Sequence, residues 1–439
     1  MERSRGGFAA ALLTLTLALA ATGAAADDTA MLRLLEVLQQ NGTLDEAAYI
    51  ALRDAANAES RPVSKGGASV SMSQDGFEVD SGDGQFRFNV GGRIHADMNI
   101  FDEDNLRLGN NTQVRRARLD FGLTFFKDWY ARLGIDWARN RTALRGTYLR
   151  YDGVEDWRFV VGQFKEAFGM ERLTSSNNIT FMERAGIAVL TPGRSIGVGT
   201  STWGDNWTAA AGVFGSSQIF DTSEQVDQSW GTSARVTWAP LLDQAENRVV
   251  HLGLAGGYRD YSKGSELRFA TRVGGTGVRL VDSGILDSVD SLSRVGAEAG
   301  MVWGPFSLQG EYIANFVNGR DGRSDSTLQG FYAYASYVLT GESRSYIRKR
   351  GFFGTVTPER RLGDGGFGAW ELALRFSQLD LSDVGSAAGR TTSMTAGLNW
   401  YVNSNVRFMA NYTNVFDIAE SEFDEAQPQI FQLRAQMNF

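Results

Sequence analysis

The sequence of 439 residues predicts an all-β protein: a transmembrane antiparallel β-barrel of about 16 strands with a short N-terminal helical, coiled-coil-like prefix. Three observations predict this fold class. Apolar and polar residues alternate with a period of two from about residue 76 onward, tight connections alternate with long ones, and aromatic residues flank the tight connections. The chain has no Cys and only two His, which excludes a disulfide framework and a thiolate site, so we expect no cofactor and no metal.

Residues 1–26 predict a signal peptide. Arg3 and Arg5 precede the apolar run 8–21, and small residues follow at 24–26. The alternative, a membrane anchor, is disfavoured because the run is shorter than the ~20 residues that a spanning helix needs. We expect the exported chain, which has a net charge of −8 before cleavage, to bind no nucleic acid.

Residues 27–57 predict a short helical hairpin or coiled-coil segment. Leu34, Leu35 and Leu38 recur at three- and four-residue spacing. This segment is too small to hold a core alone, so we expect it to pack against copies of itself. Residues 58–75 predict a flexible linker, since Ser and Gly are frequent in them.

Residues 76–439 predict the barrel. In 86–100, apolar residues such as Ile94 occupy one parity, whereas Arg93 and Asp97 occupy the other. At roughly 22 residues per strand and connection, this region holds about 16 strands, enough to enclose an aqueous lumen. The alternation returns in segments of about the length that a tilted strand needs to cross a bilayer: 117–125, 131–137, 249–259, 294–303, 306–312, 369–377, 395–402, 405–412 and 430–439.

Two further features favour a membrane barrel over a soluble sheet with one wet face. Charged residues such as Arg132 and Glu298 lie mid-strand. In a soluble sandwich the inward face of the sheet would have to pack on a second sheet, and nothing else in the chain could supply that core. Aromatic residues flank the tight connections 126–129, 203–207 and 303–306, as in an interfacial girdle. We expect the long polar stretches to form the loops of the opposite rim: 101–113, 263–290, 317–329 and 380–392.

Arginine dominates the charged residues, since only five of the 43 basic residues are Lys. A guanidinium group is always charged, and its planar fork fits phosphate and carboxylate, so an arginine-lined lumen would concentrate anions. The alternative is that these arginines only neutralise wall carboxylates such as Asp97 and Glu371, which share their parity. The arginines on or near the polar parity are Arg93, Arg116, Arg118, Arg132, Arg235, Arg259, Arg294, Arg375, Arg407 and Arg434, joined by Arg268 and Arg272.

Residues 163–195 predict an inward constriction loop. The segment is too long for a turn, and irregular backbone at membrane depth is tolerated only where it faces protein or water. The alternative is an extracellular loop with surface charges. A second basic segment, 344–361, has three open interpretations: a vestibule that collects anions, a site for lipopolysaccharide phosphates, or a solvated surface.

Nine short motifs occur in order along the chain: Gly91-Gly92-Arg93, Arg115-Arg116-Ala117, Lys127-Asp128-Trp129, the Phe-Gly-Met-Glu-Arg run 168–172, Glu183-Arg184, Tyr258-Arg259-Asp260, the run 337–344, the run 368–371 and the run 399–403. Together they resemble the phosphate-selective porins (O/P type) of Gram-negative outer membranes over residues 80–439. The terminal Phe439 is similar to the assembly signal of such barrels. The resemblance implies a homotrimer of 16-stranded barrels in the outer-membrane lipid. It also implies an arginine ladder and a constriction loop that binds phosphate or another small anion.

Matched by position, the resemblance implies ladder roles for Arg93, Arg115 and Arg116, and a central role for Arg172, where the family commonly has Lys. Arg184 matches the arginine of the Glu-Arg motif. The remaining ion-binding candidates are Lys165, the lysine of the loop, and Arg268 with Arg272, which match only after a one-residue shift. By parity, Arg115 faces lipid unless a bulge intervenes.

Two departures and several alternatives remain open. Phosphate-selective members have several central lysines, whereas this chain has one Lys in the loop and five in all. Arg145 also takes a position that is acidic in those members. The chain could therefore be a general small-solute porin, or a structural or adhesive barrel. An outer-membrane enzyme is not expected, because His95 and His251 lie mid-strand and neither is near a nucleophile motif, so we expect no catalytic residues.

Overall fold

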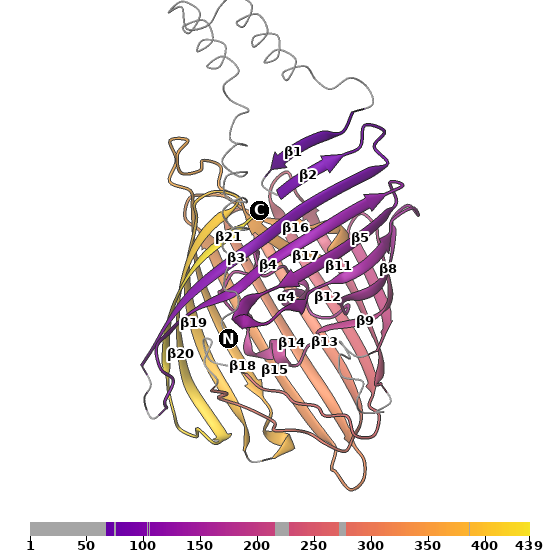
Figure 1. Ribbon diagram of the computed structural model, residues 1–439. Helices are drawn as coiled ribbons and strands as arrows, with labels where there is room; N and C mark the ends of the chain where they lie inside the picture. Colours follow the sequence, from indigo (N-terminus) through magenta and orange to yellow (C-terminus); the bar gives the residue numbers. More distant parts are fainter. Residues whose placement is uncertain are drawn as a thin grey trace, which may run out of the picture. The chain divides into compact units, whose positions relative to one another are not determined.

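The computed structural model describes residues 67–73, 76–102, 104, 106–215, 228–271, 278–385 and 387–439. The signal peptide and the helical prefix, predicted at 1–26 and 27–57, lie outside the described residues, as does most of the predicted linker. Among the described residues, sixteen antiparallel strands form a closed ring (Figure 1). Closure occurs where the last strand pairs with the first of the ring, with Arg434 opposite Asp97.

The strands of the ring are β3 (Phe86–Asp102), β4 (Asn111–Phe125), β5 (Trp129–Asp136), β7 (Thr147–Tyr151), β8 (Trp157–Lys165), β9 (Arg194–Trp203), β10 (Trp207–Phe214), β11 (Trp230–Asp243), β12 (Arg248–Asp260), β13 (Val289–Trp303), β14 (Phe306–Gly319), β15 (Ser326–Val338), β18 (Ala369–Asp380), β19 (Ala388–Tyr401), β20 (Val406–Ser421) and β21 (Gln429–Asn438). A short strand, β6 (Ala143–Leu144), pairs with β5. The predicted linker is wrong at its end, because β1 (Ser69–Ser73) pairs with β2 (Gly76–Asp80), which extends the sheet along β3. Short helical turns are α4 (Met170–Leu173), η2 (Ala138–Asn140), η3 (Gly186–Val189), η4 (Arg348–Arg350) and η5 (Ser382–Val384).

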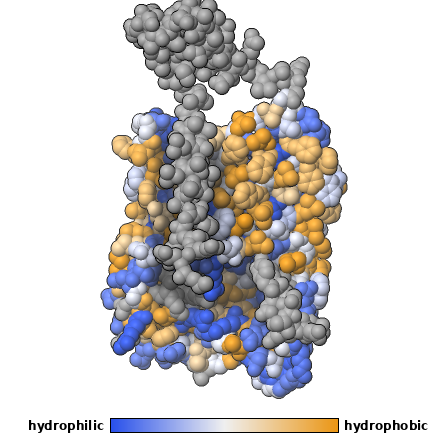
Figure 2. Space-filling model, in the orientation of Figure 1, coloured by the Kyte–Doolittle hydropathy of each residue, from blue (hydrophilic) through white to orange (hydrophobic). Residues whose placement is uncertain are grey.

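The wall is apolar outside and polar inside, as the alternation predicts. Along β3, Ile94, Met98 and Ile100 are exposed, whereas His95 and Asp97 between them are buried. Leu133 on β5 is likewise exposed. Figure 2 shows a largely hydrophobic outer wall with hydrophilic side chains gathered along the lower rim. No described helix is long and apolar enough to cross a membrane.

Several strands run further than the alternation alone predicts. β14 ends at Gly319 and β15 begins at Ser326, so the predicted loop 317–329 shortens to 320–325. The rule of tight and long connections also fails once. The connection between β15 and β18, residues 339–368, lies on the rim of the tight turns yet contains its own hairpin of β16 (Arg344–Ile347) and β17 (Phe352–Val356).

Two irregular segments fold into the barrel: residues 166–193 between β8 and β9, and the β16–β17 hairpin (Figure 1). The first is packed by buried Phe168, Phe181, Ile187 and Leu190 against the wall of β13, β14, β15 and β18. The hairpin is packed by Phe353, whose ring lies where a Cβ on Gly300 would be only 2.3 Å away. Gly300 therefore leaves room for the hairpin.

Arginines of the wall hold the backbone of segment 166–193. Arg407 donates from its two terminal nitrogens to the carbonyl oxygens of Ile179 (2.9 Å) and Thr180 (3.0 Å). Three more arginines donate to other carbonyl oxygens of this segment: Arg344 to Asn178, Arg434 to Met182 and Arg375 to Glu183. Carbonyl groups in an irregular, buried segment need donors from elsewhere, and here guanidinium groups supply them.

We predict that Arg407→Met loosens this segment without unfolding the barrel. The carbonyl oxygen of Ile179 would lose its donor at a cost of about 1–3 kcal/mol, whereas that of Thr180 would keep Asn399, so local opening should become more frequent. Hydrogen-exchange mass spectrometry should show faster exchange across residues 177–183 and unchanged exchange in β12 and β13. Arg361→Met is the matched control, because Arg361 is exposed and pairs with Asp364. Equal exchange in both variants would contradict the anchoring role.

Candidate functional site

A cavity of about 600 Å³ runs between the strands of β3–β11 and the two infolded segments. Its lining is rich in basic residues, because fifteen of the lining residues are Arg or Lys and Asp136 is the one acidic residue among the described lining residues. Some of these arginines pair with carboxylates just outside the lining, such as Asp120 and Asp152. Six of the sequence-predicted residues meet in this lining: Arg93, Arg115, Arg116, Lys165, Arg172 and Arg184. The segment predicted as a constriction at 163–195 therefore lies in the lumen and not on an outer loop.

Arg115 enters the lumen through a bulge. On β3, His95 pairs with Arg116 and Ala96 with Val114, so Arg115 is the extra residue at the register shift. The shift overrides the strict parity that would direct Arg115 to lipid. Arg115 then donates from Nε and a terminal nitrogen to the two carboxylate oxygens of Glu183, at 2.8 and 2.9 Å.

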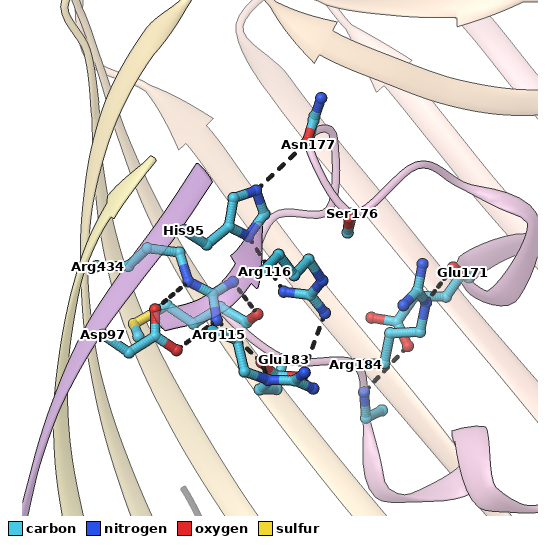
Figure 3. Close-up of polar contacts among 12 residues, drawn as sticks. His95, Asp97, Arg115, Arg116, Glu171, Ser176, Asn177, Glu183, Arg184 and Arg434 are labelled. Carbon is cyan, nitrogen blue, oxygen red and sulfur yellow. Dashed lines mark hydrogen bonds and ion pairs between the residues drawn. The ribbon is translucent and has the colours of Figure 1, made fainter. Parts of the chain in front are cut away.

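Glu183 is shared by several arginines (Figure 3). Besides Arg115, Arg434 donates to its carboxylate at 2.9 Å, and Arg116 lies 3.7 Å away. Burial alone would raise the pKa of Glu183, but the positive charges of Arg116, Arg115 and Arg434 outweigh it and hold this pKa well below its ordinary value. Glu183 is therefore a carboxylate at neutral pH.

His95 is fixed as a neutral ring between Arg116 and the constriction segment (Figure 3). A guanidinium group can only donate, so Arg116 donates to Nδ1 of His95 at 3.1 Å. The other ring nitrogen, Nε2, then donates to the side-chain oxygen of Asn177 at 3.3 Å. His95 thus takes part in hydrogen bonding in the lumen.

Lys165 and Arg184 are occupied with the backbone around α4. The Lys165 ammonium donates to the carbonyl oxygens of Arg172, Leu173 and Thr174 at 2.6, 2.8 and 3.2 Å. Arg184 donates to the carbonyl oxygens of Glu171 (2.8 Å) and Thr174 (2.7 Å). Both cations therefore neutralise the carbonyl end of this turn, and their donors are largely used there.

The other end of α4 is capped from the wall. The carboxylate of Glu311 on β14 accepts from the backbone N–H groups of Met170 (2.8 Å) and Glu171 (2.7 Å). Carboxylates are favourable at such an N-terminal end, since its N–H groups have no partner within the turn. Glu311 and Lys165 together fix the position of Arg172.

Arg172 keeps most of its donors free. Its Nε donates to the carbonyl oxygen of Pro192 at 3.1 Å, and within the described residues it has no ion pair with a carboxylate. Burial, followed by repulsion from the positive charges of Arg184 and Arg145, lowers the pKa of Arg172 to about 10. The group is thus a charged, largely unpaired cation at neutral pH.

Sequence reasoning did not select six further basic residues of this lining as ion-binding: Arg145, Arg150, Arg158, Arg194, Lys349 and Arg350. Among the described side chains, Arg194 and Arg350 form no ion pair, and Arg145 has a single contact of 4.0 Å with Asp136. Arg194 lies close to the positive charges of Arg172 and Arg145. The sequence feature that could have indicated Arg194 is its position directly after Pro192-Gly193, where the loop ends and a strand begins.

The structure does not bring Arg268 to this cavity. Arg268 lies in the long connection between β12 and β13, pairs with Asp282 and has a side chain that is 39% exposed. Arg272 lies outside the described residues. The reason is local, because the near carboxylate of Asp282 already occupies the guanidinium fork of Arg268.

The basic segment 344–361 enters the lumen in its first half. Tyr346 hydrogen-bonds through its hydroxyl to His251 (2.9 Å), and Arg235 donates to the carbonyl oxygens of Arg350 and Gly351. The basic turn η4 consequently faces the cavity, where Lys349 also lies 5.1 Å from the ring centre of Trp203. The stretch 357–361 is largely exposed, and Arg361 there pairs with Asp364.

Comparison with known proteins agrees with this architecture. The family "Phosphate-selective porin O and P" matches residues 88–439. Porin O of Pseudomonas aeruginosa is 30% identical over 416 residues, covering 83% of this chain and 91% of that protein. An uncharacterized protein of Caulobacter vibrioides is 29% identical over 352 residues, covering 76% of this chain and 69% of that protein.

Among solved structures, a loop L8 deletion mutant of OmpT, an outer membrane protein of Vibrio cholerae, superposes with a TM-score of 0.54. At 10% identity, over 81% of this chain and 100% of that one, it shows the fold alone. The protein is thus a channel of the Gram-negative outer membrane and not an enzyme. The chain belongs to the phosphate-selective porin O and P family.

Proposed function

We propose that this porin carries small anions by passive diffusion, with phosphate and related oxyanions preferred, and with no chemical step. One observation carries the proposal: fifteen basic residues and one acidic residue line the cavity through the constriction. Guanidinium forks suit tetrahedral oxyanions, and a narrow, low-dielectric passage of one charge sign attracts the opposite ion. Phosphate comes from the name of the family.

Within this proposal the arginines have different roles. Arg172 and Arg194 coordinate the ion, because their donors are the least occupied in the constriction. Arg93, Arg115 and Arg116 guide it along the β3–β4 wall. Lys165 and Arg184, whose donors are bound to backbone carbonyls, position the constriction instead of binding the ion directly.

A general small-anion porin without phosphate preference is the second candidate. The observation that favours it is the loss of Lys165 and Arg184 as ligands, which leaves fewer donors for a multivalent ion. The two candidates differ in one measurable property, the concentration at which phosphate blocks the chloride current.

We predict that Arg172→Ala or Arg194→Ala raises the phosphate concentration for half-block by about tenfold, because hydrogen bonds to charged groups are worth about 1.5–3 kcal/mol. Planar-bilayer recordings in KCl with added phosphate measure this value together with the chloride-to-potassium permeability ratio. Arg361→Ala, in the exposed part of the basic segment, is the control. A wild-type channel that prefers potassium would refute anion transport, and a chloride current that phosphate does not block would leave the general anion porin.

We also propose that the protein is a homotrimer embedded in outer-membrane lipid and lipopolysaccharide. The resemblance described above implies the trimer. The unequal lengths of the strands around the barrel support an oligomer, because they leave one side of the wall lower than the other. β5, β7, β8, β9 and β10 have only 8, 5, 9, 10 and 8 residues, whereas β11–β15 have 13–15. A tilted strand of eight residues spans roughly 20 Å, less than the ~25 Å apolar band of such barrels. A neighbouring copy would cover this low wall.

Native mass spectrometry in detergent tests the trimer, and we expect three copies per complex. Val198→Arg places a charge on the outward face of β9 in the low wall, where Val198 is exposed, and should shift the complex to monomers. Leu254→Arg, outward on β12 in the tall wall, is the matched control and should leave three copies. Monomers of the wild-type protein would contradict the proposal.

A further inference from the structure

We propose that Glu183 is a built-in competitor for the passing anion: its carboxylate occupies the guanidinium fork of Arg115 and is displaced when an oxyanion enters the constriction. This inference rests on the proposed function, since it concerns how tightly the same passage holds an anion. It assigns Glu183 a part in selectivity instead of a purely structural one.

The geometry of the pair carries the inference. Nε and a terminal nitrogen of Arg115 each donate to a different oxygen of Glu183, at 2.8 and 2.9 Å. This two-point arrangement is the one by which a guanidinium group recognises a phosphate or carboxylate ion. An incoming oxyanion can therefore bind the fork of Arg115 only by replacing Glu183.

Glu183 differs from three buried carboxylates of the wall in where it lies. Its side chain is 36% exposed, whereas those of Asp97, Glu298 and Glu371 are at most 2% exposed. Glu183 also belongs to the infolded segment, while the other three belong to wall strands. The side chain of Glu183 is thus partly exposed. Its displacement would leave the backbone in place, because Arg375 donates to the Glu183 backbone carbonyl oxygen at 2.9 Å.

The charge balance around Glu183 shows why a competitor matters. Arg434 is already neutralised by Asp97, at 2.7 Å from both carboxylate oxygens, whereas Glu183 is shared with Arg115 and Arg116. Without Glu183, two guanidinium groups on the cavity wall would face the passage with no carboxylate partner. Conduction requires binding that is weak enough for the ion to leave, and an internal carboxylate weakens it.

Glu183→Gln in reconstituted full-length protein tests the inference. The amide cannot hold the fork as a charge-assisted pair, so inorganic phosphate should block the chloride current at roughly tenfold lower concentration and stay bound longer. Glu183→Asp keeps the charge but shortens its reach, and should give an intermediate block. A gain in affinity is decisive, because a merely structural role would predict a loss.

Glu371→Gln is the matched control. It removes one lumen carboxylate, but its partner Arg344 is buried away from the cavity around Arg172, so phosphate block should stay at the wild-type value. Unchanged or weaker block in Glu183→Gln, in a channel whose wild type prefers anions, would overturn this inference alone. A wild type that does not prefer anions would instead overturn the proposed function.

Discussion

Backbone hydrogen bonding at membrane depth is the constraint on which the rest of this structure depends. In hydrocarbon each unpaired N–H or C=O group costs several kcal/mol, so the strands must close into a ring. The ring closes through β21 and β3, and the outer residues of these strands are apolar. The same constraint applies inside, where two irregular segments must find donors for their carbonyl groups.

Arginine side chains supply the donors for these carbonyl groups, and this explains why the lumen holds two kinds of arginine. Arg344, Arg375, Arg407 and Arg434 extend from the strands or hairpin around the infolded segment and donate to its carbonyl oxygens. Their charge is used in holding the constriction in place. The cavity-lining arginines of β3–β9, together with Arg172, lie where an anion could reach them. One residue type thus both builds the passage and determines its charge.

The alternation of apolar and polar residues was enough to predict the ring, because side chains of a strand must face lipid or lumen in turn. It could not predict the bulge that turns Arg115 inward, since one inserted residue changes parity without changing composition. The resemblance to the family selected Arg172, and this residue lines the cavity. Neither the alternation nor the resemblance could predict that Lys165 and Arg184 donate their hydrogen bonds to backbone carbonyl groups, because this depends on the path of an irregular segment.

The hairpin at 344–356 shows a similar limit. Its basic residues are evident in the sequence. That the hairpin folds into the barrel depends on the packing of Tyr346 and Phe353 and on the space that Gly300 leaves, which the sequence does not reveal. Arg194 was overlooked because it begins a strand, and its exposure to the cavity depends on where the preceding segment ends.

Crystallography with selenate tests the central claim most directly, because the ion is a tetrahedral oxyanion and its selenium can be located by anomalous scattering. The division of arginines into two kinds predicts an anomalous peak between Arg172 and Arg194, and no peak beside Arg407 or Arg434. Selenate bound at Arg407 or Arg434, with the Arg172 site empty, would contradict it.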